Sequence, residues 1–201
     1  MTKAVASPRD ELAQAYAAVR AHSEKLAAPL SAEDCALQSM PDASPVKWHL
    51  AHTTWFFETV ILAKLPGYKP ADPRFAFLFN SYYEALGPRH PRPRRGLLSR
   101  PSLEEIHAYR AQVDAAMMRA CGDEALRDAI ILGLHHEQQH QELILTDIKH
   151  AFFSNPLLPA YRSGPAPPRT AQKLEWLRHD GGAVMIGHDG SGFAFDNETP
   201  R

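Results

Sequence analysis

The chain is poor in cysteine, with only Cys35 and Cys121 among its 201 residues. Two thiols are too few for a disulfide framework or for a four-thiolate zinc site, so we expect both to be free and reduced.

Excess charge and long apolar runs are also lacking. Lys and Arg number 22 against 23 Asp and Glu, which gives a formal net charge of −1. This balance argues against a nucleic-acid or anionic-membrane partner, because both require a concentrated positive surface. No stretch approaches the ~18–20 apolar residues of a membrane span. The first residues turn polar at once instead of forming the apolar core of a signal peptide, so we expect a cytoplasmic protein.

Histidine, by contrast, is abundant: the chain has 11, as many as its glycines. Two of them lie in the longest uninterrupted helical pattern, which runs from Glu124 to Phe153 without a proline. Because residues four apart share a helix face, His136 and His140 point to the same place. Two imidazoles alone do not hold a metal, so an exposed polar turn or hydrogen-bonded core histidines are the alternative.

The pattern predicts three further long helices. One is expected over residues 8–27 and a second over 46–64, each opened by a Ser-Pro cap signature. A third is expected from the capping box of Ser102 and Glu105 to about Cys121. Four helices with apolar faces, and no convincing strand before residue 180, predict an all-α bundle, in which metals bind between facing helices.

A third imidazole is available on the second predicted helix. Trp48, His52 and Trp55 fall on one aromatic face of that helix. His49 lies beside this face, so periodicity alone leaves both histidines open as the inward one. The alternative is a core histidine packed beside the tryptophans.

Residues 65–101 form a long excursion rich in proline, aromatic side chains and arginine. Its aromatics supply apolar area that disordered segments lack, and long loops inside compact domains are often functional. Four arginines between residues 89 and 95 favour an anion site, because guanidinium groups match carboxylates. A solvated basic loop is the alternative.

The character of the chain changes after a proline-rich joint near residues 156–168. Residues 181–188 alternate as in a strand, and the glycine-rich stretch 189–192 is typical of a turn. We therefore expect a short β-containing start of a second domain that the sequence does not complete.

Together these motifs resemble the N-terminal part of the sulfoxide synthases (hercynine oxygenases) of ergothioneine biosynthesis, which are non-haem iron enzymes. In that family a DinB-like four-helix bundle precedes a domain similar to the formylglycine-generating enzyme. The resemblance implies a DinB-like metal-binding bundle over residues 1–160, a linker over 161–180 and the truncated start of the second domain over 181–201. The stretches that carry it are residues 44–58, 80–83, 89–100, 136–150 and 181–201.

The resemblance also implies site residues and an activity. His52, His136 and His140 would bind Fe(II), and Gln139 would face the imidazole of hercynine or histidine. Arg89 and Arg92 would hold the carboxylates of the sulfur donor, cysteine or γ-glutamylcysteine, and O2 would be the oxidant. Three imidazoles leave octahedral positions open for such substrates. The acid tyrosine of the family is expected beyond residue 201, so no catalytic residue is assigned within this chain and we expect the 201 residues alone to be inactive.

Three other functions fit parts of the pattern. His136 to His140 satisfies the H-E-x-x-H pattern of zinc proteases with Glu137 as base, but Leu143 stands where the extended motif needs glycine and no sheet precedes the helix. A DinB-like bundle that uses a divalent metal to transfer a small thiol would share the histidines without needing residues 181–201. A non-catalytic metal-binding module is the third possibility.

Overall fold

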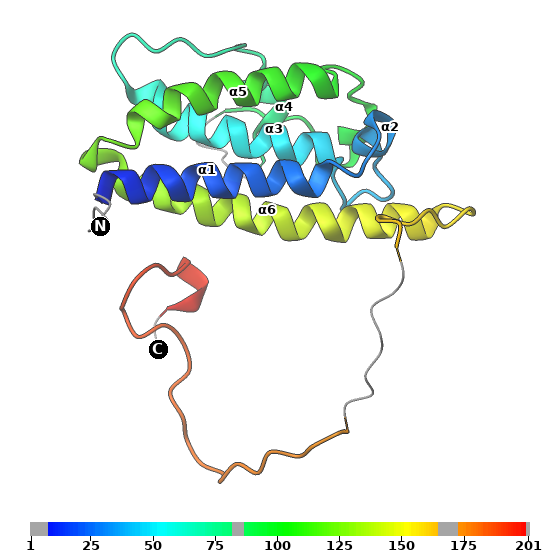
Figure 1. The fold of residues 1–201 in the computed structure, drawn as a ribbon, viewed down its shortest axis with the longest axis vertical. Coiled ribbons are helices and arrows are strands. Elements are labelled where there is room, and N and C mark those ends of the chain that lie inside the picture. The colour runs from blue at the N-terminus through cyan, green and yellow to red at the C-terminus, as the bar shows by residue number, and fades with distance from the viewer. Residues whose placement is uncertain (1–7, 82–86, 165–172, 200–201) are drawn as a thin grey trace, which may run out of the picture. The chain divides into compact units, whose positions relative to one another are not determined.

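The computed structural model describes residues 8–81, 87–164 and 173–199. The chain separates into two compact units, Met1–Ser163 and Gly164–Arg201. The first unit is a helical bundle, so the predicted all-α class is confirmed. Figure 1 shows its long helices packed side by side: α1 (Pro8–Ala27), α3 (Val46–Phe56), α5 (Leu103–Ala120) and α6 (Arg127–Ser154).

The local signal for the third predicted helix, α5, acts as expected. The side chain of Ser102 accepts a hydrogen bond from the backbone N–H of Glu105, and the Glu105 carboxylate accepts one from the N–H of Ser102, which completes the capping box of α5. A short 3-10 turn, η5 (Glu124–Leu126), leads into α6. The expected cap of the first helix, Ser7, lies outside the described residues.

The second predicted helix is not one uniform α-helix. After α3 the backbone widens into the π-helix η1 (Phe57–Ile61) and then tightens into the 3-10 helix η2 (Leu62–Lys64). The wide turn lies where the ring of Phe57 packs on α6 at Gly133, since a Cβ added to Gly133 would fall 2.5 Å from that ring. The glycine that weakens α6 in sequence terms is thus what lets η1 approach it.

Ser44 does not cap α3, contrary to the cap signature that we inferred. The N-cap residue is Pro45, without a side-chain hydrogen bond. The backbone N–H of Ser44 instead donates to the Asp147 carboxylate of α6 at 2.8 Å. A tertiary contact therefore replaces the local one.

The excursion is ordered against the bundle over its described parts. It contains the helix α4 (Phe75–Phe79) and the 3-10 helix η4 (Arg92–Leu97), and the small helix α2 (Ala32–Ala36) lies earlier in the chain. Phe79 is buried in the core, and Arg95 is only 3% exposed. A wholly solvated basic loop is therefore wrong for this segment. Tyr82 and Tyr83, which formed part of the family resemblance, lie outside the described residues.

The second unit contains no strand within residues 173–199. Its one regular element there is the 3-10 helix η6 (Asp196–Glu198). Apolar side chains such as Trp176 and Ile186 are largely exposed. The β-containing start over residues 181–201, like the domain boundaries as a whole, stays a prediction.

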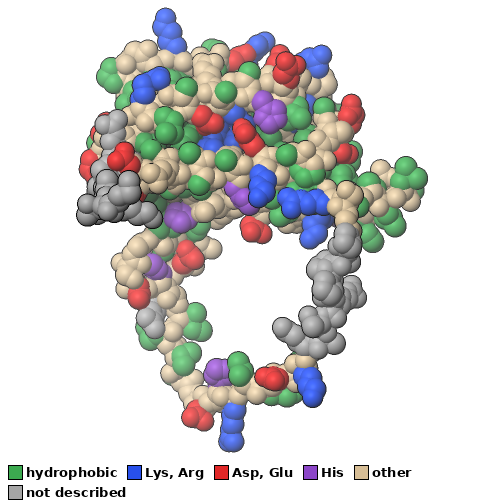
Figure 2. Space-filling view, in the orientation of Figure 1, with side chains coloured by type: hydrophobic (Ala, Val, Ile, Leu, Met, Phe, Trp, Pro, Cys, Tyr) green, Lys and Arg blue, Asp and Glu red, His purple; other side chains and the backbone are tan. Residues whose placement is uncertain are grey.

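On the face drawn in Figure 2, acidic and basic side chains are mixed over most of the helical unit, and several basic side chains lie together at its lower right. Among the described residues, no helix has both the length and the hydropathy needed to cross a membrane.

Candidate metal centre

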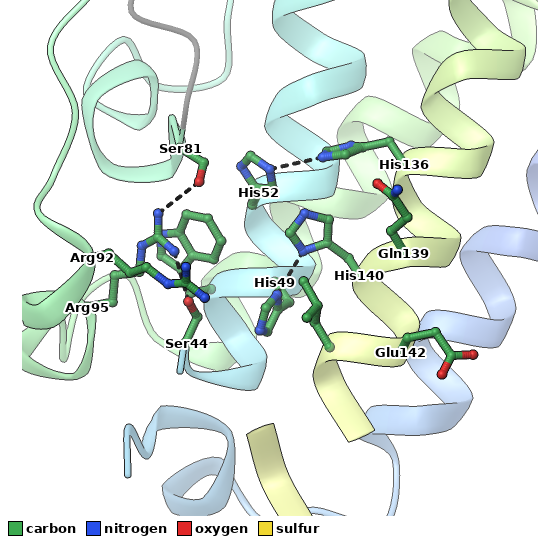
Figure 3. A pocket seen from close by; sticks show the side chains of 12 residues that line it. Ser44, His49, His52, Ser81, Arg92, Arg95, His136, Gln139, His140 and Glu142 are labelled. Atoms are coloured by element: carbon green, nitrogen blue, oxygen red, sulfur yellow. Dashed lines mark hydrogen bonds between the residues drawn. The ribbon is translucent and has the colours of Figure 1, made fainter. Parts of the chain in front are cut away.

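Three histidines from two helices meet between α3 and α6. His52 of α3 faces His136 and His140 of α6, and one ring nitrogen of each lies within 4.8 Å of the others. Figure 3 shows the rings converging from the two helices. The structure thus brings together the three side chains that the resemblance implied as ligands.

A backbone contact fixes the ring of His52. Its Nδ1 lies 2.5 Å from the carbonyl oxygen of Phe79, so this nitrogen must carry the proton and donate. The bare Nε2 then faces Nε2 of His136, 3.2 Å away. His49, which periodicity alone could not exclude, turns its Nε2 to the Asp147 carboxylate at 3.0 Å, and its Nδ1 lies 2.8 Å from Nδ1 of His140. His52 is therefore the inward imidazole of α3.

Burial keeps the three rings neutral. It lowers the pKa of His136 to about 4 and places the pKa of His52 and of His140 well below the ordinary value. For the last two, repulsion from neighbouring histidines lowers the pKa further. At neutral pH all three rings are therefore in the form in which imidazole binds metal ions.

The histidines line a cavity of about 680 Å³, a size typical of small-molecule sites. Gln139 lines the same cavity from α6, and Arg92 lies across from it on η4 (Figure 3). Neutral nitrogen ligands and a positively charged wall therefore share one space, an arrangement that suits an anionic ligand next to a bound cation.

Comparison with known proteins identifies the bundle. Residues 15–144 match the DinB superfamily. The chain belongs to the DinB superfamily. No curated protein matches it. DinB is a metal-binding superfamily, and many of its members are metal-dependent enzymes.

The residues of this DinB bundle fit a divalent transition metal. Three neutral imidazoles are donors that suit Fe, Zn, Cu and Ni. The facing nitrogens support this fit, because the bare Nε2 of His52 and Nε2 of His136 lie 3.2 Å apart and point to one place. The geometry shows that a metal could be held here, and the assignment of His52, His136 and His140 as its ligands stays a prediction.

The arginines are placed unequally around the DinB site. Arg92 lines both the histidine cavity and a neighbouring hollow of about 350 Å³, whereas Arg89 lines the hollow alone. The guanidinium of Arg89 also donates to the backbone carbonyl of Ser81. Substrate binding by Arg89, Arg92 and Gln139 stays a prediction, and Arg92 is the better placed of the two arginines.

Arg95 is a wall residue that the sequence did not single out. Its guanidinium carbon lies 3.3 Å from the ring centroid of Trp48, and its nitrogens donate to the hydroxyls of Ser44 (2.8 Å) and Ser81 (3.2 Å). Trp48 in turn stacks on His52, with ring centroids 4.6 Å apart and planes 11° apart. The sequence could not single out Arg95 among the neighbouring arginines, because the conformation of η4 decides which guanidinium group points toward Trp48.

Glu137 is not available as the base of a zinc protease. Its side chain is buried, and its carboxylate accepts hydrogen bonds from Arg20 (2.9 Å), Arg110 (3.2 Å) and Ser23 (2.6 Å). Burial alone would raise the pKa of Glu137, but the two arginines outweigh it and lower the pKa to about 2. A carboxylate so acidic and so fully bonded is a poor proton acceptor, so H-E-x-x-H is here a coincidence of spacing.

Proposed function

We propose that this chain carries the Fe(II) site of a sulfoxide synthase of ergothioneine biosynthesis. The reaction joins a carbon of the imidazole ring of hercynine, or of histidine, to the sulfur of cysteine or γ-glutamylcysteine and uses O2. One observation carries the proposal: three neutral imidazoles and an arginine-bearing wall enclose the same cavity. The resemblance of residues 44–58, 89–100 and 136–150 to that family adds the substrate class.

The overall chemistry needs both an electron acceptor and a place for two polar substrates. Forming the C–S bond and oxidising the sulfur to a sulfoxide release four electrons, which reduce one O2. One oxygen atom enters the sulfoxide, and the other leaves as water with the hydrogens lost from carbon and sulfur. Bound iron would supply the chemistry with O2. Within the chain, Arg92 and Arg89 would bind donor carboxylates, and Gln139 would orient the acceptor ring by hydrogen bonding.

Anaerobic Fe(II) titration tests the metal site directly. We expect one ion per chain, and we expect His52→Ala, His136→Ala and His140→Ala each to weaken binding by more than the roughly 10- to 100-fold typical of outer-sphere changes. His107, which lies on α5 outside the cluster, provides the control His107→Ala. Equal affinity in wild type and His136→Ala would contradict the proposal.

Product analysis tests the reaction. The protein from the complete open reading frame, loaded with Fe(II) and given hercynine, a thiol and O2, should yield a sulfoxide whose mass shifts by two units when ¹⁸O2 is used. Metal binding without any sulfoxide, with either thiol, would contradict the assigned activity while leaving the metal site intact.

A second candidate is a metal-dependent thiol transferase. It is favoured by the extent of the family match, which covers the bundle at residues 15–144 and no part of residues 181–201. Such an enzyme would transfer a thiol to an electrophile under anaerobic conditions with Zn(II). Thiol consumption that requires O2 distinguishes the synthase from the transferase.

A further inference from the structure

A fourth histidine of the same cavity, His49, contacts the three-histidine cluster through His140. Nδ1 of His49 lies 2.8 Å from Nδ1 of His140, and Nε2 of His49 lies 3.0 Å from Oδ2 of Asp147. The same carboxylate oxygen accepts the backbone N–H of Ser44 at 2.8 Å. His49 is only 2% exposed, so these groups form a continuous buried chain from a carboxylate to a candidate ligand.

The Asp147 carboxylate determines the directions of the hydrogen bonds that link it to His49 and His140. The Asp147 carboxylate is ionised, because hydrogen bonds from His49 and the Ser44 backbone outweigh the effect of burial and lower its pKa. An ionised carboxylate can only accept, so Nε2 of His49 must donate to it. In the neutral imidazole, Nδ1 of His49 is then an acceptor.

This acceptor dictates the tautomer of the next ring. Nδ1 of His49 can receive a hydrogen bond from His140 only if His140 carries its proton on Nδ1. Nε2 of His140 is then bare and available to a metal. With the opposite tautomer, the two Nδ1 atoms would meet as bare lone pairs at 2.8 Å, and Nε2 of His140 would carry a proton toward the metal site.

We propose that His49 and Asp147 are positioning residues that hold His140 as an Nε2 ligand through a carboxylate–histidine–histidine relay. The inference rests on the proposed metal site. It gives a role in that site to His49 and Asp147, which are not themselves proposed ligands. His52 is held in the corresponding way by the carbonyl of Phe79, so the tautomer of two of the three proposed ligands is fixed. Within the described part of the chain, Nδ1 of His136 has no such partner. Outer-sphere partners of this kind orient metal-bound histidines and make them more basic.

A double-mutant cycle on metal affinity tests the relay. His49→Phe keeps a planar ring but removes both nitrogens, and Asp147→Leu keeps side-chain size but removes the acceptor. Each should weaken Co(II) or Fe(II) binding by about 10- to 100-fold. If both act through His140, the double variant should bind no more weakly than His49→Phe alone, because the carboxylate has nothing left to orient.

Two further variants separate positioning from general damage to the fold. Asp147→Asn retains an oxygen that can accept from Ser44 and His49, so it should recover most of the affinity lost in Asp147→Leu. His150→Phe changes a ring on the same helix that bonds Ser39 outside the cluster, and it should leave affinity unchanged. The apo forms are compared by thermal unfolding, and the visible spectrum of the bound Co(II) reports ligand geometry in each.

The outcomes are distinct. If wild type binds no metal, the proposed function fails. If wild type binds and His49→Phe binds equally well with an unchanged Co(II) spectrum, the metal site stands and the relay is overturned. Multiplicative losses in the double variant would also overturn it, since they would mean that Asp147 and His49 act separately.

Discussion

The buried carboxylate of Glu137 should contribute strongly to stability rather than to catalysis. It lies between Arg20 of α1 and Arg110 of α5, and its side chain is 1% exposed. Replacing it by glutamine removes the negative charge while keeping the shape, so two buried guanidinium groups lose their shared counter-ion. Breaking a buried ion pair of this kind costs about 3–5 kcal/mol.

The pKa gives an independent magnitude and a pH dependence. Relative to the ordinary glutamate pKa of 4.5, the lowered pKa of about 2 for Glu137 corresponds to about 3 kcal/mol of stability at neutral pH. Because the folded-state pKa is the lower one, this contribution is fully present above about pH 4.5 and is lost as the pH falls toward 2. The difference in the free energy of unfolding between wild type and Glu137→Gln should therefore become smaller as the pH falls from about 4.5 toward 2.

Urea unfolding of the apo protein measures both effects. Glu137→Gln should lower the free energy of unfolding by about 3 kcal/mol at pH 7, with less difference at pH 3. Glu142→Gln on the same helix is the matched control, because that side chain is exposed, and surface changes usually stay within about 0.5 kcal/mol. A loss in Glu137→Gln no larger than in the control would refute the argument that this glutamate is structural.

Four other variants probe the packing and the cavity. Gly133→Ala should destabilise the protein by about 1–3 kcal/mol, because the added Cβ would overlap the ring of Phe57. This loss should outweigh the better helix propensity of alanine. Unchanged thermal unfolding would show that η1 and α6 can move apart. Tyr109→Phe should cost about 1.5–3 kcal/mol, since it removes a buried 2.6 Å hydrogen bond to the Glu58 carboxylate, and chemical unfolding measures the loss. If the proposed activity holds, Arg92→Ala and Arg89→Ala in the protein from the complete open reading frame should each raise the KM of the thiol donor by the equivalent of about 1.5–3 kcal/mol per charge-assisted bond lost, with unaltered Fe(II) affinity. Unchanged donor kinetics in both would remove the arginines from the site.

The local features of this fold can be predicted from the amino-acid sequence alone. Proline and capping residues set where helices begin, as the capping box at Ser102 shows, because these signals act within a few residues of backbone. The four-residue spacing of His136 and His140 places them on one face of any α-helix. Resemblance to a family, rather than periodicity, then pointed to His52 as the third member of the cluster.

Which groups near the site face one another depends on how the helices pack, and the sequence pattern does not predict it. The choice between His49 and His52 depends on how α3 rotates against α6, and the carbonyl of Phe79, 27 residues away from His52, fixes that ring. The role of Asp147 had a faint signal, since it lies seven residues after His140 and thus on the same face, but its partner comes from another helix. No pattern in the sequence indicated the burial of Arg95 or the pairing of Glu137 with two arginines. Such contacts join residues far apart in sequence, and their energies depend on distance and burial, which exist only after the helices have packed.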